Sequence, residues 1–62
     1  MLRAQDITAG DTLYDREFDE LMLVLRVRPD PRGDQVSVVS EDGLYSTMLL
    51  RMFPDLENYG AG

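Results

Sequence analysis

Most side chains in this 62-residue chain that could carry chemistry are carboxylates. The sequence holds 12 acids and six bases, all arginine, with no histidine and no cysteine. A catalytic carboxyl group must be desolvated in a cleft, and Asp15 with Asp19, or Glu41 with Asp42, are the candidate pairs. A chain this short encloses few clefts, and no calcium-loop spacing is present. The sequence therefore predicts a protein that is not an enzyme, with no cofactor and no metal site.

Five acids cluster between residues 11 and 20: Asp11, Asp15, Glu17, Asp19 and Glu20. The simplest interpretation is a solvated loop that keeps a small domain soluble. The alternative is an acidic surface that imitates the phosphates of nucleic acid and so inhibits a host enzyme or defence complex. The net charge of −6 argues against nucleic acid itself as a partner, because such binding depends on cationic side chains that displace counterions.

The longest apolar run is Leu21–Arg28 (LMLVLRVR), and its period decides the fold class. With a period of two, one face carries the leucines and Val27, and the other carries Met22, Val24 and the arginines. This pattern predicts a central strand with Leu25 in the interior. Helical spacing of Tyr14, Phe18 and Leu21 supports the alternative, an α+β fold with a helix over about residues 15–28 packed on a β-hairpin.

Pairing with the next segment favours the strand. Residues 29–34 form a turn by composition, and Gln35–Ser40 (QVSVVS) has high β-propensity. If Arg28 pairs with Gln35, Leu25 lies opposite Val38 and the apolar faces coincide.

Glu41-Asp42-Gly43 predicts a tight hairpin turn with glycine at a left-handed position. A three-residue loop places Ser46 opposite Val38 and Met48 opposite Val36, which gives a more apolar core than a two-residue loop. The last strand is predicted over Leu44–Met52.

The C-terminal region predicts a single helical turn at Pro54–Glu57, with proline at a first helical position. Residues 60–62 have no side chain that could anchor them, so we expect a flexible C-terminal tail. Residues 1–59 are then expected to form the single domain. The expected fold is all-β, a small barrel of about four to five antiparallel strands with one C-terminal helical turn.

The outer face of this barrel predicts a binding surface. An apolar stripe with an aromatic side chain and an arginine has the composition of a protein-binding site. The alternative is that the N-terminal segment or the acidic loop covers the stripe. The predicted protein-binding residues are Met22, Val24, Arg26, Val39 and Tyr45.

The order of elements resembles an SH3-like small barrel, and Ile7–Asp11 (ITAGD) resembles the I-x-x-G-D start of KOW-type barrels. With its arginine-only basic set and its LMLVL strand, the chain also resembles short accessory proteins of actinobacterial bacteriophages. This resemblance implies a virion component or accessory module that docks on a larger protein assembly or on copies of itself. No signal-peptide core or membrane-length apolar run is present, so the expected location is the cytoplasm or a virion assembled there.

Overall fold

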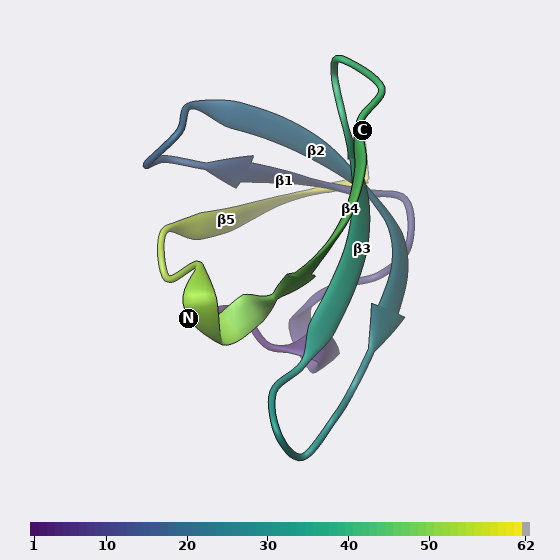
Figure 1. The fold of residues 1–62 in the computed structure, drawn as a ribbon, viewed down its shortest axis with the longest axis vertical. Helices are drawn as coiled ribbons and strands as arrows, with labels where there is room; N and C mark the ends of the chain where they lie inside the picture. Colours follow the sequence, from purple (N-terminus) through teal and green to yellow (C-terminus); the bar gives the residue numbers. More distant parts are fainter. Residues whose placement is uncertain (62) are drawn as a thin grey trace.

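The computed structural model describes residues 1–61, which form one antiparallel sheet that curls into an open barrel (Figure 1). Across these residues the sheet order is β4-β3-β2-β1-β5. The all-β prediction is confirmed, and the helix over residues 15–28 is wrong, because residues 20–28 form a strand. The strands are β1 (Asp11–Asp15), β2 (Glu20–Arg28), β3 (Gln35–Ser40), β4 (Tyr45–Leu49) and β5 (Leu56–Ala61), and the 3₁₀ turns are η1 (Ala4–Asp6) and η2 (Leu50–Met52).

A bulge in β2 reverses part of the expected alternation. Val24 pairs with Val38 and Arg26 pairs with Ser37, so Leu25 is an extra residue on the β2 side. A bulge of this kind breaks the period of two, because two residues of one strand oppose one residue of its partner. The predicted pairing of Arg28 with Gln35 is confirmed, whereas the pairing of Leu25 with Val38 is wrong.

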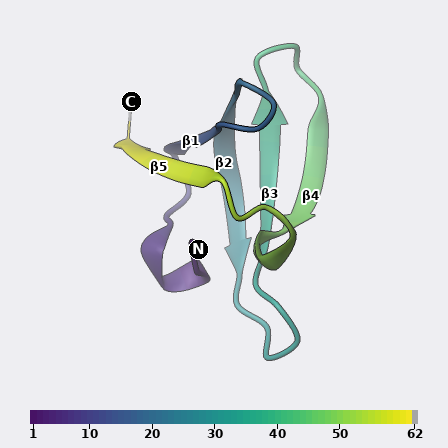
Figure 2. The same ribbon diagram turned by 90° about the vertical axis from the view of Figure 1, so that its left-hand side faces the viewer.

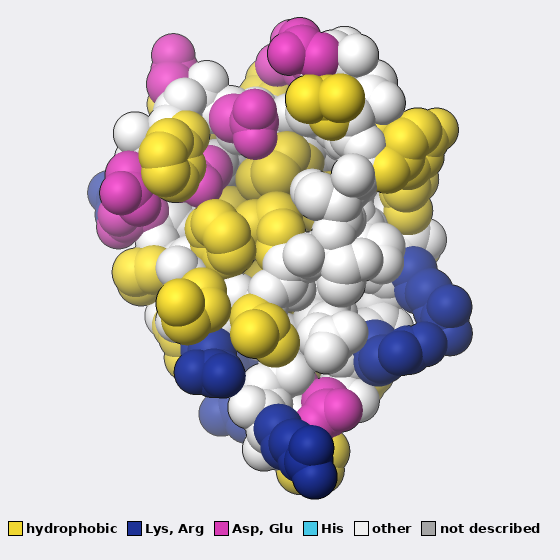
Figure 3. All heavy atoms as spheres, viewed as in Figure 1, with side chains coloured by type: hydrophobic (Ala, Val, Ile, Leu, Met, Phe, Trp, Pro, Cys, Tyr) yellow, Lys and Arg dark blue, Asp and Glu magenta, His cyan; other side chains and the backbone are white. Residues whose placement is uncertain are grey.

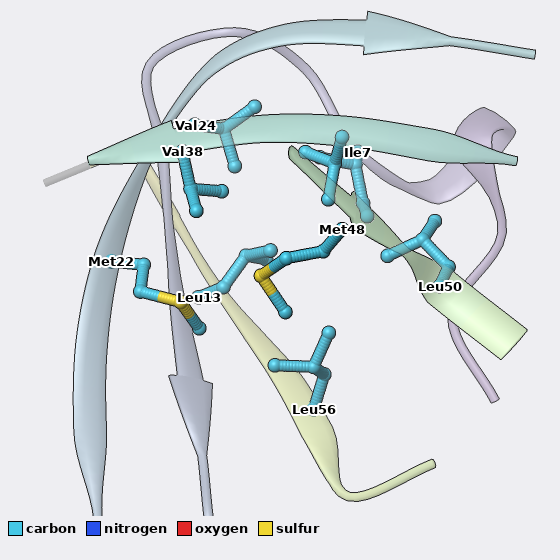
Figure 4. Packing of buried hydrophobic residues seen from close by; sticks show 9 residues of the cluster. Ile7, Leu13, Met22, Val24, Val38, Met48, Leu50 and Leu56 are labelled. Carbon is cyan, nitrogen blue, oxygen red and sulfur yellow. The ribbon is translucent and has the colours of Figure 1, made fainter. Parts of the chain in front are cut away.

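The core lies inside the curl of the sheet (Figure 4). Leu13 is fully buried and Val24 is 1% exposed, whereas Leu23 and Leu25 are 44% and 41% exposed. The prediction that Leu25 lies in the interior is therefore wrong. The buried cluster consists of Ile7, Leu13, Met22, Val24, Val36, Val38, Met48, Leu50 and Leu56.

The β3–β4 hairpin has the predicted register. Val38 pairs with Ser46 and Val36 pairs with Met48. Gly43 has a φ of +85°, a left-handed conformation that glycine adopts without steric cost. The strand itself is shorter than predicted, because β4 ends at Leu49 and the chain turns into η2.

The C-terminal segment differs from its prediction in two ways. The helical turn lies at η2, before Pro54, and β5 begins at Leu56 instead of a helical turn continuing to Glu57. Gly60 pairs with Thr12 and Ala61 with Asp11, so these two residues belong to the sheet and not to a flexible tail. Backbone pairing with β1 anchors them, which needs no large side chain. Gly62 lies outside the described residues.

The N-terminal segment closes one end of the barrel (Figure 2). Ile7 joins the core, and the backbone N–H of Ala4 donates to Asp34 Oδ2 at 2.7 Å. Asn58 Nδ2 donates to the carbonyl oxygen of Asp6 at 2.9 Å. These contacts hold the segment at the barrel end. Among residues 1–61, no helix is long and apolar enough to cross a membrane.

Candidate protein-binding surfaces

The outer face of the sheet carries a row of mainly apolar, partly exposed side chains that crosses four strands. Leu23 of β2 lies between Thr12 of β1 and Val39 of β3, and Val39 is paired in turn with Tyr45 of β4. Tyr45 is 76% exposed, and Leu23 is nearly half exposed. The alternative in which the N-terminal segment or the acidic loop covers the predicted stripe is therefore wrong for Tyr45.

The predicted protein-binding residues divide between this face and the core. Arg26, Val39 and Tyr45 lie on the outer face, as predicted, in the rows that pair β2, β3 and β4. Met22 and Val24 are wrong as surface residues, because they are 5% and 1% exposed and belong to the core. The bulge explains the error: before Leu25, the side chains of β2 have the opposite orientation from the one that an unbroken alternation gives.

Sequence reasoning missed the leucines that replace Met22 and Val24 on this face. Leu23 and Leu25 are exposed, and half-buried Leu21 pairs with Tyr14, whose ring stacks on that of Tyr59 with centroids 5.6 Å apart. A run of alternating hydrophobic residues does not indicate which of them will be the extra residue of a β-bulge. We call the set formed by the exposed residues Leu23, Leu25 and Tyr45 and the half-buried Val39 the outer stripe.

Opposite charges border the outer stripe at its two ends. Arg26 and Arg28 line a polar hollow of about 220 Å³ with Ser37 and Thr47, whose hydroxyl oxygens are 3.3 Å apart. Within residues 1–61 the side-chain ion pairs belong to Arg16, so neither of these two arginines has an acidic partner. Glu41 borders the other end, in a hollow of about 330 Å³ that Leu23 and Val39 also line. The stripe therefore offers an apolar centre with charged ends.

Two of the five predicted acidic-surface residues hold the fold together. Asp15 is 4% exposed and accepts the backbone N–H of Glu17 at 2.9 Å. Asp11 accepts the N–H of Thr8 at 2.8 Å and Asn58 Nδ2 at 3.0 Å. These two bonds stabilise the charged form and lower the pKa of the Asp11 carboxyl group.

Of the remaining three acids, Glu17 and Asp19 lie on the exposed β1–β2 turn and Glu20 is the first residue of β2. Asp19 has a φ of +52° and accepts the hydroxyl of Tyr14 at 2.6 Å. That bond, aided by the charge of Asp19, raises the pKa of Tyr14. Glu17 and Glu20 are exposed. Of the five acids, Asp15 is buried, so it does not contribute to an exposed acidic surface, whereas Asp11 is half-buried and the other three are exposed.

A second surface opens into the barrel between the start of β2 and the edge strand β4. Two adjoining hollows, of about 330 Å³ and 460 Å³, share Glu20, Met22 and Ser46 in their linings. Figure 3 shows hydrophobic side chains at the floor of a hollow on this face. We call the two hollows together the β4 groove. Its lining also includes Asp15, Phe18, Val38, Ser40, Leu44, Tyr45, Thr47, Met48 and Phe53.

Within residues 1–61, no group of three or more metal-binding side chains is close enough to hold an ion. Comparison with protein-family models, with curated proteins and with solved structures finds no match. The chain is a small all-β protein with an apolar outer stripe and an adjoining groove, and its resemblance to SH3-like and phage accessory proteins stays a prediction.

Proposed function

We propose that this protein is a non-enzymatic interaction module that binds another protein through its outer stripe. The observation that carries the proposal is the continuity of the stripe, which runs across the three strands β2, β3 and β4 with Leu23, Leu25 and Tyr45 all exposed. A surface patch that combines tyrosine and leucine with arginine at its border has the composition of a protein interface.

The charged ends suggest how such a partner is oriented. Arg26 and Arg28 have no acidic partner among the described residues and are available to acids at the border of a partner surface. Charges at an interface border act mainly on the association rate and on orientation, while the buried centre supplies affinity. The resemblance to phage accessory proteins makes a larger protein assembly the partner that we propose.

A photo-crosslinking amino acid placed at Tyr45 tests this function in the source cell. The matched control position is Met52, which is 62% exposed and lies in η2, away from the stripe. We expect one dominant protein adduct from position 45, lost when Leu23→Ser is added, and no such adduct from position 52. Equal adducts from both positions, or an adduct that Leu23→Ser leaves unchanged, would contradict the proposal.

The same crosslinking experiment on the purified protein distinguishes self-association from binding to a different protein. A crosslinked dimer of the purified chain, with the same dependence on Leu23, would make a second copy the partner of the stripe. Adducts that appear only in cells would make the partner a different protein. Both results support an interaction module, whereas activity on a small molecule that survives Leu23→Ser would not.

A further inference from the structure

We propose that β4 is a docking edge for an extended peptide segment of a partner protein, and that this segment places a lysine or arginine side chain in the β4 groove. The site borders the outer stripe, because Tyr45 belongs to both, but it uses the backbone edge of β4 and the β4 groove, so it goes beyond the function proposed above. Its basis is a free strand edge next to an apolar groove whose charged side chains are acidic.

The backbone of β4 offers hydrogen bonds on the side away from β3. The N–H of Ser40 donates to the carbonyl oxygen of Leu44, and the N–H of Leu50 donates to that of Asp34, both at 2.9 Å. Paired residues alternate between bonded and non-bonded in an antiparallel ladder. Ser46 and Met48 therefore bond to β3, and the backbone groups of Tyr45, Thr47 and Leu49 point toward the free edge.

This edge lacks the features that protect exposed strands from pairing. Such protection comes from lysine or proline on the strand, from bulges, or from inward-pointing charges. The sequence of β4, YSTML, has no charge and no proline, and its pairing with β3 shows no register shift. The opposite edge strand differs, because β5 has an irregularity in its pairing with β1 near Gly60.

The β4 groove would receive every second side chain of an added strand. Neighbouring strands lie about 4.8 Å apart, and their side chains alternate between the two faces of the sheet. A segment beside β4 would direct alternate side chains over Met22 and Met48, two flexible residues that adapt to different apolar shapes. Phe18, which is 65% exposed, and half-buried Phe53 border the same hollow.

The negative charge of the β4 groove favours a partner segment that carries a cationic side chain. Asp15 and Glu20 line it, and no arginine does. The nearby Arg16 forms ion pairs instead with Asp55 and Glu57, with nitrogen–oxygen distances of 3.5 Å and 3.8 Å. A lysine or arginine side chain that enters from the partner strand would meet the exposed carboxylate of Glu20 and, deeper in the groove, the buried carboxylate of Asp15, which also accepts the N–H of Glu17. Near a protein surface such opposite charges attract more strongly than in bulk water.

Two synthetic peptides test the proposal by titration of the ¹⁵N-labelled full chain. The first has the sequence Thr-Val-Thr-Lys-Thr-Val-Thr with blocked ends, and the second has glutamate in place of lysine. Titration to about 5 mM peptide detects dissociation constants near 1 mM. We expect amide shifts centred on Tyr45, Thr47 and Leu49, and an affinity at least about tenfold higher for the lysine peptide.

A matched pair of variants separates backbone pairing from side-chain contact. Thr47→Pro removes an N–H that points to the free edge, so the β3–β4 ladder keeps its bonds. Thr47→Val keeps that N–H and loses only the hydroxyl near Ser37. We expect Thr47→Val to bind like the original chain and Thr47→Pro to lose binding. If Thr47→Pro does not fold, N-methylation of the lysine peptide removes the same bonds from the ligand side.

Glu20→Gln tests the charge. It should reduce the preference for the lysine peptide over the glutamate peptide several-fold. The proposal is overturned if the two peptides bind equally, if neither shifts the β4 amides, or if backbone N-methylation leaves binding unchanged. A dimer of the chain that Thr47→Pro dissociates would also overturn it, because the edge would then belong to a second copy.

Discussion

Replacing Val24 by alanine tests the placement of the β2 side chains, on which both proposed surfaces depend. Val24 is 1% exposed and is paired with the equally buried Val38. Removing two buried carbons costs about 1.6 kcal/mol in transfer free energy, at about 0.8 kcal/mol each. A residual cavity of roughly 30 Å³ adds about 0.7 kcal/mol. We therefore expect the free energy of unfolding to fall by about 2 kcal/mol.

The neighbouring residue supplies the matched comparison on the same strand. Leu25→Ala removes more carbon than Val24→Ala, yet Leu25 is 41% exposed, so we expect a loss below about 1 kcal/mol. Urea unfolding followed by circular dichroism measures both variants. With a slope near 1 kcal/mol per molar urea, the midpoint should drop by about 2 M for Val24→Ala and by less than about 1 M for Leu25→Ala. Equal losses, or a larger loss at Leu25, would show an unbroken alternation in β2 and refute the bulge.

Three further predictions concern local contacts. The N–H groups of Ala4 and Asp30 lower the pKa of Asp34 below 3.8, so its contribution to stability is present above the unfolded-state pKa and is lost as the pH falls through the lower folded-state pKa. Thermal unfolding at decreasing pH should show this loss, and Asp34→Asn should remove part of it. Gly43→Ala should cost about 1 kcal/mol from backbone strain alone, measured as a lower Tm, because nothing lies within 4 Å of the added carbon. Asp19→Asn should lower the pKa of Tyr14 toward 10.0, measured by tyrosinate absorbance, and no change would place the hydrogen bond elsewhere.

Local turn chemistry and cross-strand burial were enough to predict the β3–β4 hairpin. Gly43 supplies the left-handed residue, and the choice of loop length followed from which register buries more apolar surface. Both signals lie within a few residues of each other, so no long-range information was needed. The same holds for the end of the β2–β3 hairpin, where Arg28 pairs with Gln35 as predicted.

The errors have causes that lie outside any local pattern. The bulge at Leu25 lies in a strand that pairs with both β1 and β3. A bulge bends its strand, and a run of alternating hydrophobic residues does not indicate where the bend occurs. The pairing of Gly60 and Ala61 is backbone pairing with β1, which begins about fifty residues earlier in the chain. Side-chain reasoning therefore had no signal for either feature. Two of five predicted site residues, Met22 and Val24, were assigned to the surface for the first of these reasons.

The bulge in β2 also places more exposed leucine on the outer face than an unbroken alternation of side chains would, which makes this face a better candidate for a binding surface. Without the bulge, Leu23 and Leu25 would face the interior and add buried apolar surface to the core, which is small in a chain of this length. Instead, the core receives Met22 and Val24, and Leu23 and Leu25 stay 44% and 41% exposed. Burying the exposed part of each leucine would contribute about 1 kcal/mol, since full burial of such a side chain contributes about 1.5–3 kcal/mol. That stabilisation is absent from the isolated fold, and a partner that covered the outer stripe, as we propose, would supply it.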